Sequence, residues 1–522
     1  MNRNPWVKRG SWNVLDARSL SDKVIECDVA IIGTGPGGAV SAARLSKAGY
    51  DVCLVEDGGL NTAKDFAKNE LESFSLYQDN GFRLTKNLDI QILQGRTVGG
   101  SSTINWTSSF RLPETTLDFW KNNYDVSWNM EDINPWFSSI EEDLNIHQWP
   151  GAPNTNNQIL AKGLEKLGHK SQRLKRNVSG CHNLGYCGMG CPVNAKNSML
   201  ITKIPDALEL GAKLIHNAYA YKYKWSGSKI SSLSIRPSYG PGKFGDQEIS
   251  LKAKHFILAA GGIGSPGVLL RSEAPNPHNT LGQRTTLHPV VASAARMKEE
   301  VHGYVGAPQT VYSDAFMQDD EKNGTIAFKL ETTPIFPTQI SSLIPMHGPK
   351  NRKYMEKFPH VSTIIALMRD GYHEESLGGT IHLDSFQRPI LDYPWSETLE
   401  RTAKKAMKTI TEVQFAAGAE EVYPIHVHST PKASLKKVIS EIDSYKMSPP
   451  FLKVLSAHVM GGCSMGAPER GVVNEWGQHH QLENLHVFDG SMFPTSLGVN
   501  PQGSIYGIVS FLSERLIKSG MI

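Results

Sequence analysis

CDVAIIGTGPGGAVSAARLSKAGYDVCLVED, residues Cys27 to Asp57, is the stretch that decides the fold of this chain. Its order is strand, glycine-rich turn, helix and strand. An apolar run over Asp28 to Ile32 leads into a G-x-G-x-x-G turn, whose glycines allow the backbone to approach a pyrophosphate closely. The phosphates are expected at the N-terminus of the helix that follows. The glycines of this turn are Gly33, Gly35 and Gly38.

The residues after the turn support the same prediction. Small and apolar side chains predict a helix that packs on a sheet, and Gly49 is placed to end it in a left-handed cap. A second strand over Asp51 to Val55 then delivers Glu56, where an acidic side chain accepts hydrogen bonds from a ribose diol. The whole stretch therefore predicts a dinucleotide site and leaves nicotinamide and flavin cofactors open.

Length and composition set wider limits. A chain of 522 residues has room for two or three domains, and 39% hydrophobic with 20% charged residues is typical of a soluble enzyme. A net charge of +3 is too small to indicate nucleic acid as a partner. The sequence has no run of 18 apolar residues and no apolar signal segment at its start, so we expect a cytoplasmic protein. Peripheral membrane contact and the oligomeric state are left open.

A second glycine-rich segment, GRTVGGSSTINWTSSFRLP, covers Gly95 to Pro113. Its small residues could let the backbone run close along a flat ligand, although an ordinary Gly/Ser turn is the alternative. The residues that form this loop are Gly95, Gly99, Gly100, Ser101, Ser102 and Asn105.

The segment from Gly95 to Asn105 resembles the first signature of the glucose-methanol-choline (GMC) family of flavin oxidoreductases, and the chain is most similar to bacterial and long-chain alcohol oxidase or dehydrogenase members. The resemblance implies an α/β fold, α+β overall, in which a Rossmann-like FAD-binding domain carries an inserted antiparallel-sheet substrate domain. Ile104 stands where members with covalent FAD have His, which implies noncovalent FAD. We expect the FAD-binding domain over residues 1–115, 178–290 and 453–522, and the substrate domain over 116–177 and 291–452.

Three cysteines lie close together in GCHNLGYCGMGCPVNAK: Cys181, Cys187 and Cys191 form a C-x5-C-x3-C array. Three thiolates from one loop are suitable ligands for an iron-sulfur cluster, whereas zinc would need a fourth ligand such as His182. Similar arrays in some members of the resembled family carry a 3Fe-4S cluster. The alternative is that the cysteines are reduced and simply packed in a glycine-rich loop.

The middle of the chain, from about Val291 to Leu452, has strand-like segments broken by Gly and Pro, followed by a long helix over Glu397 to Ala417. This pattern predicts an antiparallel sheet with helices behind it. One proline-flanked segment is more apolar than a typical loop, and is either buried packing or a hydrophobic substrate entrance. Its apolar residues are Ile335, Phe336, Ile340, Leu343, Ile344 and Met346.

The last 70 residues resemble the C-terminal signature of the GMC family. The resemblance implies that His458 is the catalytic base and that Asn500 is the second catalytic residue. A histidine with a pKa near neutral suits removal of a hydroxyl proton while a hydride leaves the same carbon. A strand over Asn484 to Asp489 and a terminal helix would supply further cofactor contacts. These contacts are Asp489, Gly490, Asn500, Pro501 and Gln502.

Together these patterns predict an FAD-dependent enzyme that oxidises the CH-OH group of a hydrophobic or bulky alcohol, with oxygen or a quinone or cytochrome as electron acceptor. Two alternatives remain open within the same fold. One is a lyase or a light-driven photodecarboxylase, and the other is a sugar-type dehydrogenase that passes electrons through an iron-sulfur cluster. A hydrolase is disfavoured, because the G-x-S-x-G segment from Gly462 to Gly466 has no strong apolar strand before it.

Overall fold

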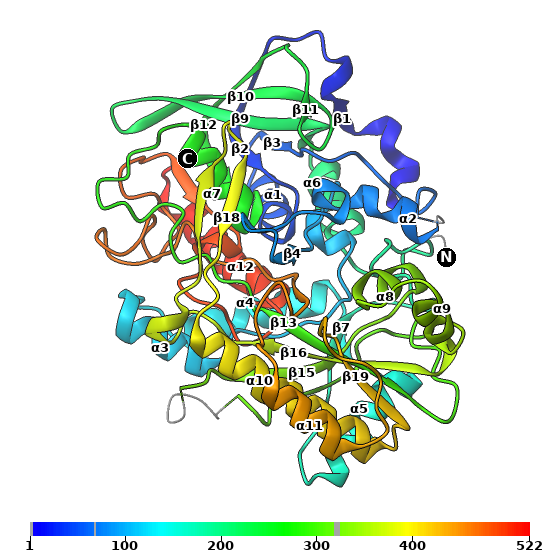
Figure 1. Ribbon diagram of the computed structural model, residues 1–522. Coiled ribbons are helices and arrows are strands. Elements are labelled where there is room, and N and C mark those ends of the chain that lie inside the picture. Colours follow the sequence, from blue (N-terminus) through cyan, green and yellow to red (C-terminus); the bar gives the residue numbers. More distant parts are fainter. Residues whose placement is uncertain (1–3, 67–68, 318–323) are drawn as a thin grey trace.

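The protein is described by a computed structural model that covers residues 4–66, 69–317 and 324–522. Two β-sheets dominate the fold (Figure 1), one in the upper half of the view and one in the lower half. The C-terminal helix α12 (Gln502–Ser519) lies between the two halves. The predicted fold class is therefore confirmed.

The first sheet is built around the strand that ends in the glycine-rich turn. This strand, β2, pairs in parallel with β3 on one side and with β12 on the other. Helices α1 and α6 pack against each other, and α1 also packs on α12. The strands in sheet order are β1 (Asn13–Asp16), β8 (Lys213–His216), β3 (Val52–Val55), β2 (Val24–Ile32), β12 (Ile249–Leu258), β10 (Lys229–Gly240) and β11 (Lys243–Phe244), with β21 (Leu485–Val487) on β12 and β9 (Ala218–Ser226) on β10.

Helix α1 spans Pro36–Lys47 and starts directly after the turn. It is followed by Gly49 with a φ of +92°, as the predicted left-handed cap requires. Helix α6 spans Lys203–Glu209, and α7 spans Gly261–Arg271, where it follows β12 after a second short turn. The first sheet therefore presents two helix N-termini, those of α1 and α7, just beyond the ends of its central strands.

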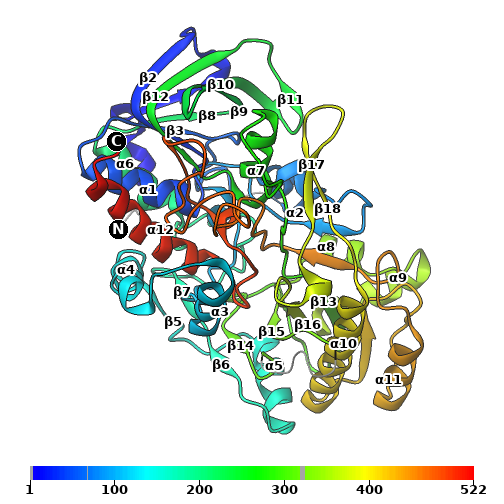
Figure 2. The ribbon, with the colours of Figure 1, turned by 90° about the vertical axis from the view of Figure 1, so that its left-hand side faces the viewer.

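The second sheet is antiparallel except where β20 pairs in parallel with β4. Helices α10 and α5 lie together on it (Figure 2), and α11 packs beside α10. The strands in order are β4 (Ile90–Ile92), β20 (Val454–Ser456), β13 (Val290–Arg296), β16 (Val361–Met368), β15 (Phe328–Thr332), β14 (Val311–Ser313) and β6 (Gln172–Arg173), with β19 (Glu421–Pro424) on β13. The helices are α10 (Glu397–Ala417), α5 (Thr155–Lys166) and α11 (Leu435–Ser444).

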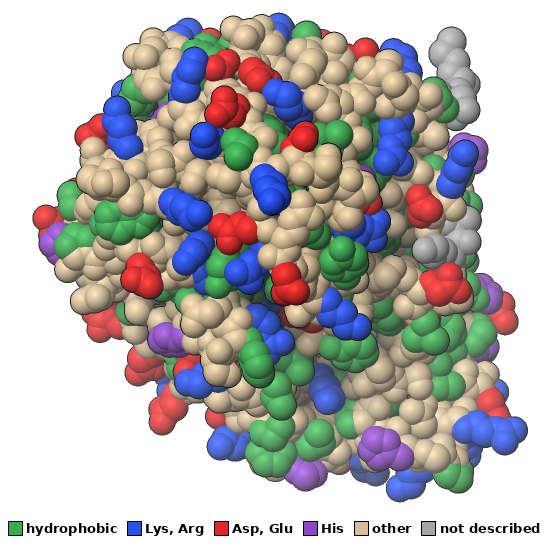
Figure 3. All heavy atoms as spheres, turned by 90° about the horizontal axis from the view of Figure 1, so that it is seen from above, with side chains coloured by type: hydrophobic (Ala, Val, Ile, Leu, Met, Phe, Trp, Pro, Cys, Tyr) green, Lys and Arg blue, Asp and Glu red, His purple; other side chains and the backbone are tan. Residues whose placement is uncertain are grey.

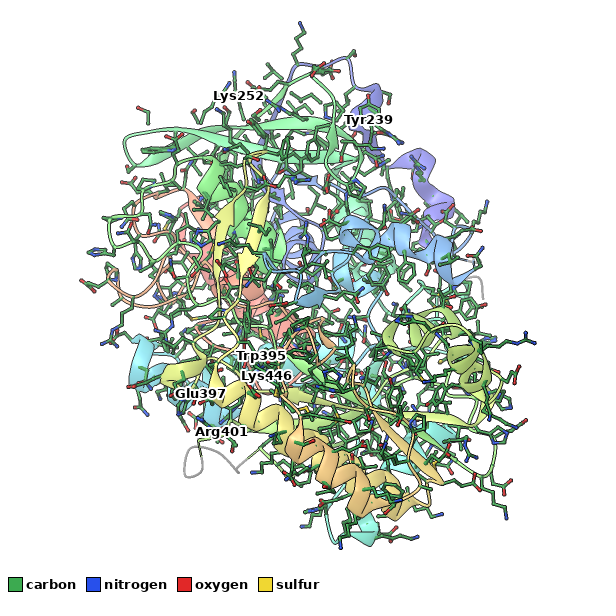
Figure 4. The ribbon with its side chains drawn as sticks, viewed as in Figure 1. Tyr239, Lys252, Trp395, Glu397, Arg401 and Lys446 are labelled. Atoms are coloured by element: carbon green, nitrogen blue, oxygen red, sulfur yellow. The ribbon has the colours of Figure 1, made fainter. Side chains whose placement is uncertain are left out.

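Helix α10 has the bounds that the sequence predicts. Ser396 caps its N-terminus by accepting a hydrogen bond from a backbone amide, and Gly418 ends it at a φ of +104°. Figure 4 labels Trp395, Glu397 and Arg401 at its start, where the Arg401 guanidinium lies 3.3 Å from the Glu397 carboxylate. Its apolar side chains recur at helical spacing and are buried in the second core. They are Leu399, Ala403, Ala406, Met407, Ile410 and Val413.

Several shorter elements connect the two halves. Helices α3 (Glu114–Tyr124) and α4 (Met130–Asp143) contribute buried side chains to the core of the first sheet, and α4 packs on α12. The hairpin of β17 (Thr380–Leu383) and β18 (Pro389–Asp392) packs on α7. The remaining α-helices and strands are α2 (Glu70–Ser73), α8 (Pro337–Leu343), α9 (Pro349–Met355), β5 (Ile146–Gln148) and β7 (Lys175–Asn177).

The surface over the first sheet carries charges of both signs. Seen from above (Figure 3), Lys and Arg side chains lie among Asp and Glu side chains rather than in one separate patch. One such pair is Lys252 with Glu26, whose charged atoms are 3.4 Å apart. Among the described residues, no helix is both long enough and apolar enough to cross a membrane.

Candidate active site

The three glycines of the turn have different surroundings. Gly33 has a φ of +100°, and a Cβ atom there would lie 2.2 Å from the carbonyl oxygen of Ala259. A Cβ at Gly38 would lie 2.0 Å from the oxygen of Gly33. A Cβ at Gly35 would meet no heavy atom of the described residues within 4 Å. Gly33 and Gly38 therefore allow the turn to pack, whereas Gly35 leaves open space beside the N-terminus of α1, which fits a pyrophosphate.

Glu56 follows β3 and is buried beside the turn. Its Oε2 accepts hydrogen bonds from the amide of Thr34 at 3.1 Å and from Thr34 Oγ1 at 2.6 Å, and Oε1 accepts from the amide of Gly58 at 2.9 Å. Burial raises the pKa of the Glu56 carboxyl to about 7. Thr34 Oγ1 also accepts from the Gly99 amide at 2.9 Å, so this threonine joins the turn to the second glycine-rich loop.

The loop from Gly95 to Asn105 is held by its own hydroxyl groups. Ser101 Oγ accepts from the Gly95 amide at 3.0 Å, and Ser102 Oγ donates to the Gly99 oxygen at 2.6 Å. A Cβ at Gly99 would lie 2.4 Å from Thr103 Oγ1, so Gly99 packs within the loop. These bonds fix the backbone close to the turn.

The C-terminal segment forms hydrogen bonds with the start of α7 and with the loop from Gly95 to Asn105. Asp489 Oδ2 accepts from the Gly261 amide at 2.8 Å and from Ser265 Oγ at 2.6 Å, which ties it to the first turn of α7. Burial raises the pKa of the Asp489 carboxyl. At the start of α12, Gln502 Oε1 accepts from Asn105 Nδ2 at 2.6 Å. The two ends of the chain are thus joined around one site.

A single cavity of about 610 Å³ runs through this site, within the usual range of roughly 300–1,000 Å³ for small-molecule and cofactor sites. Among the predicted site residues, only Gly38, Gly99 and the cysteines do not line it. The others do: Gly33, Gly35, Glu56, Gly95, Gly100, Ser101, Ser102, Asn105, His458, Asp489, Gly490, Asn500, Pro501 and Gln502. The fold therefore brings residues from both ends of the chain to one space.

His458 lines the same cavity and stands two residues after β20. Its Nδ1 is 3.2 Å from Nδ1 of His288, and His288 Nε2 accepts from the Gly498 amide at 2.9 Å. Nε2 of His458 has no hydrogen-bond partner within the described part of the chain. Burial, together with the positive charge of Lys329, lowers the pKa of His458 to about 3, so the ring is neutral at physiological pH.

One wall of the cavity is apolar. It is formed by one face of the second sheet, through Val290, Ala292, Ile365, Leu367 and Leu455. Helix α8 adds to this wall. Among the apolar residues in and beside this helix, Ile335, Phe336, Ile340 and Leu343 line the cavity. Ile335 and Ile340 also pack with Ile344 and Phe358 in a separate small core. The apolar loop therefore serves both as packing and as a wall of the cavity.

The cysteine loop does not support the predicted cluster. All six cysteines are free thiols, and Cys187 Sγ lies 3.6 Å from the Arg176 guanidinium. Burial raises the pKa of the Cys187 thiol, which favours the protonated form, whereas a metal ligand must be a thiolate. No group of three His, Cys, Asp or Glu residues in the described ranges could hold a metal ion. The prediction that Cys181, Cys187 and Cys191 ligate iron is therefore not supported.

Several residues at the site were not predicted, because no motif in the sequence identifies them. Thr34 occupies a variable position inside the glycine motif, and His288, Gln309, Lys329 and Glu331 come from segments without a motif. A charged pair such as Lys329 and Glu331 two positions apart in an apolar strand, AFKLETT, is unusual for a buried strand. That pattern could have pointed to a functional strand.

Comparison with family models places the chain among flavoenzymes. Two models described as GMC oxidoreductase match residues 73–290 and 375–508, and one described as FAD binding domain matches residues 26–64. The last match covers the turn, α1 and Glu56.

Relatives of the chain include long-chain-alcohol oxidase FAO4A from Arabidopsis thaliana, which is 29% identical over 96% of this chain and 70% of the relative. Long-chain-alcohol oxidase FAO1 from the same plant is 27% identical over 96% of this chain and 68% of the relative. A cholesterol oxidase from Acinetobacter baumannii is 24% identical and covers 94% of this chain and 93% of the relative.

Solved structures agree on the fold. A mutant of formate oxidase from Aspergillus oryzae RIB40 superposes with a TM-score of 0.68 at 14% identity, covering 96% of this chain and 99% of the other. Pyridoxine 4-oxidase from Mesorbium loti has a TM-score of 0.65 at 17% identity and covers 94% of this chain and 99% of the other. At these identities the likeness concerns the arrangement of the backbone.

Proposed function

The chain belongs to the GMC oxidoreductase family, and from this premise we propose that it uses noncovalently bound FAD to oxidise the CH-OH group of a hydrophobic or bulky alcohol. The observation that carries the proposal is the continuity of one cavity, which runs from Gly35 and Glu56 to His458 and Asn500 and has an apolar wall at the second end. A cofactor and a lipophilic substrate could therefore lie end to end in it.

The cofactor would be held by the groups that line the first part of the cavity. Gly35 and the N-terminus of α1 would receive the pyrophosphate, and Glu56 would accept from the ribose hydroxyls. The loop from Gly95 to Asn105 and the start of α12 would lie along the ring system. FAD, when bound, supplies the acceptor for the hydride that leaves the alcohol carbon. Ile104 lines the cavity and has no nucleophilic atom, which agrees with noncovalent binding.

Two side chains of this protein would act on the alcohol. His458 is neutral and lines the cavity, so it can take the hydroxyl proton. Asn500 can donate a hydrogen bond from Nδ2 to the alcohol oxygen, and it does not compete for the proton because an amide does not titrate. The hydroxyl would then lie between these two groups.

The chemistry of the wall favours a lipophilic alcohol. A long chain or a bulky ring could cover Val290, Ile365, Leu367 and Phe336 and remove their apolar surface from water. A sugar would instead need many polar partners in this part of the cavity. The long-chain-alcohol oxidases among the relatives agree with the first choice, although at 27–29% identity they do not specify the substrate.

The division of the chain into an FAD-binding domain (1–115, 178–290 and 453–522) and a substrate domain (116–177 and 291–452) stays a prediction. The second sheet supplies the apolar wall, as a substrate domain would. However, β4 from the first range joins the second sheet, and α3 and α4 from the second range pack in the first core. The two parts therefore exchange elements at their boundary.

The decisive test is reduction of the bound flavin by alcohols without oxygen and in the dark. A panel should contain a long-chain primary alcohol, a sterol and a sugar, and the absorbance of oxidised flavin should fall with a lipophilic member. If no alcohol bleaches the flavin, the proposal fails. Repeating the reaction with oxygen and with artificial acceptors then separates an oxidase from a dehydrogenase. Acid precipitation should release the flavin into the supernatant, and flavin in the pellet would refute noncovalent binding.

The proton-transfer step is tested by His458→Ala. Loss of a general base should slow anaerobic flavin reduction by about 10²- to 10⁴-fold while FAD stays bound. His428→Ala is the matched control, because His428 is exposed and does not line the cavity. A full rate in His458→Ala would remove His458 from this role.

A further inference from the structure

Strand β15 carries a buried ion pair beside the cavity. Lys329 and Glu331 stand two residues apart, on the same face of the strand, and their side chains are 2% and 0% exposed. Lys329 Nζ lies 2.9 Å from Glu331 Oε1. A pair this deeply buried is seldom a gain in stability over apolar side chains, so its presence calls for another reason.

Asn500 is held between the two charges. Lys329 Nζ donates to Asn500 Oδ1 at 3.0 Å, and Asn500 Nδ2 donates to Glu331 Oε2 at 3.2 Å. An ammonium can only donate and a carboxylate can only accept, so the ion pair permits only one of the two orientations of the amide. Glu331 and Asn500 line the cavity, and the second hydrogen on Nδ2 remains available there.

The remaining sides of the pair are closed by further contacts. Gln309 Nε2 donates to Glu331 Oε2 at 2.8 Å. The Lys329 ammonium lies 3.3 Å from the ring centroid of Phe110 and 4.7 Å from that of Tyr312, which are favourable cation-π positions. Lys329 is therefore enclosed by protein groups, which hold its ammonium away from solvent.

We propose that Lys329 is a positioning residue for the alcohol oxidation proposed above: it fixes the Asn500 amide so that an N–H meets the alcohol oxygen. This inference rests on the proposed function. Lys329 does not touch the reacting atoms, since it acts through Asn500 and through the electric field at His458. Glu331 balances the charge and so allows a cation to be buried there.

The groups around His458 agree with this electrostatic role. From the segment before β13, His288 contacts the His458 ring, and from β15 come Lys329 and Glu331. After β16 lie Arg369 and Asp370, and the Asp370 carboxylate binds the amide of His288. Burial and then Lys329 lower the pKa of His458. Removal of the Lys329 charge should therefore raise it.

The test compares Lys329→Met with the double variant Lys329→Met/Glu331→Leu, both loaded with FAD. The double variant removes both charges and leaves no unpaired ion, so it should fold even where the single variant does not. In both variants we expect anaerobic flavin reduction at pH 8 to slow at least tenfold. In Lys329→Met, where the Glu331 charge remains, we also expect the acid limb of the pH profile to move to higher pH. Lys86→Met is the control, because Lys86 forms an exposed pair with Asp392.

A double variant with the parent rate would overturn the proposal. A second measurement does not need an alcohol: the His458 ring is titrated by NMR in FAD-loaded protein labelled with ¹⁵N-histidine. Its titration should move to higher pH in Lys329→Met, and an unchanged titration would also overturn the electrostatic role. If no alcohol reduces the parent flavin, the proposed function fails, and this titration still decides whether Lys329 controls His458.

Discussion

The two ends of the cavity are built in different ways. At the nucleotide end, the groups that would contact the cofactor are mainly backbone amides and glycines of one continuous stretch, and Glu56 is bound mainly by Thr34 in that same stretch. At the substrate end, the groups are side chains from four separate segments: His288, Lys329 with Glu331, His458 and Asn500. One end is local in sequence, and the other depends on tertiary structure.

This difference has a physical origin. The pyrophosphate of a dinucleotide has the same structure in every such cofactor, and a tight turn before a helix presents several N–H groups to it within a short stretch of sequence. A substrate oxygen needs one base and one donor at fixed positions, which any pair of packed segments can supply. The substrate end should therefore tolerate changes of local sequence but respond to changes in its buried charges.

The largest effect is expected from Gly33→Ala. Its Cβ would collide with the Ala259 oxygen and would require a φ near +100° from alanine, so we expect a loss of about 4 kcal/mol or more in unfolding free energy. Gly35→Ala should instead fold normally and bind FAD more weakly, because its Cβ enters the open space beside α1. Denaturant unfolding of the apoproteins and fluorescence titration with FAD measure the two effects. Equal stability losses in both variants would contradict the different roles of these glycines.

The next largest effect concerns the support of the substrate end. The Asp370 carboxylate accepts from the amides of Leu287 at 2.8 Å and His288 at 3.0 Å, and from the Tyr393 hydroxyl at 2.8 Å. In Asp370→Asn, an NH₂ group replaces one carboxylate oxygen and faces a hydrogen-bond donor. We expect this to lower the unfolding free energy by about 3 kcal/mol. Denaturant unfolding should show this loss, together with slower flavin reduction because His288 is displaced.

Tyr393→Phe provides the control for that experiment. It removes one hydrogen bond to Asp370 without introducing a wrong donor, so we expect a loss of only about 1 kcal/mol. If Asp370→Asn were no more destabilising than Tyr393→Phe, the carboxylate would not be the group that holds His288 in place.

The sequence predicts more of the nucleotide end of the site than of the substrate end. The order of β2, turn, α1 and β3 follows from apolar periodicity and glycine placement, and α10 follows from its helical pattern with Ser396 and Gly418 at its ends. The ion pair of Lys329 and Glu331 could not be assigned to the cavity, because nothing in β15 itself indicates that Asn500 lies beside it. The iron-sulfur cluster expected from the cysteine array is not supported, because spacing alone says nothing about the burial that raises the pKa of the Cys187 thiol.

A smaller effect should appear in the pH dependence of FAD binding. Burial raises the pKa of Glu56 to about 7 in the protein without FAD, and ribose hydroxyls that donate to it would favour the ionised form. FAD affinity should therefore fall about tenfold between pH 8 and pH 6. Glu56→Gln should bind FAD weakly with a flat profile. Equilibrium titration at each pH provides the measurement, and the same slope in Glu56→Gln would assign the effect to another group.

The same pKa has the opposite effect on the stability of the apoprotein. The unfolded carboxyl ionises near its usual value of 4.5, below the folded value of about 7. The contribution of Glu56 to stability is therefore greatest below pH 4.5 and is lost as the pH rises to about 7. Between these two pH values, the unfolding free energy of the apoprotein should fall more steeply with pH than that of Glu56→Gln, which lacks the titrating group. Denaturant unfolding at each pH measures both.

The smallest effect is expected from Thr34→Val, which tests how the nucleotide turn is joined to the loop from Gly95 to Asn105. The hydroxyl of Thr34 donates to Glu56 at 2.6 Å and accepts from the Gly99 amide at 2.9 Å. Valine has the same shape but leaves the Gly99 amide unpaired, so we expect a loss of about 1 kcal/mol in unfolding free energy. The affinity for FAD should fall by a larger factor than the rate of flavin reduction, because the loop that contains Gly99 moves whereas His458 does not. Thr34→Ser, which keeps the hydroxyl, should restore binding, and a failure to do so would indicate that packing of the threonine methyl group, rather than its hydrogen bonds, joins the two loops.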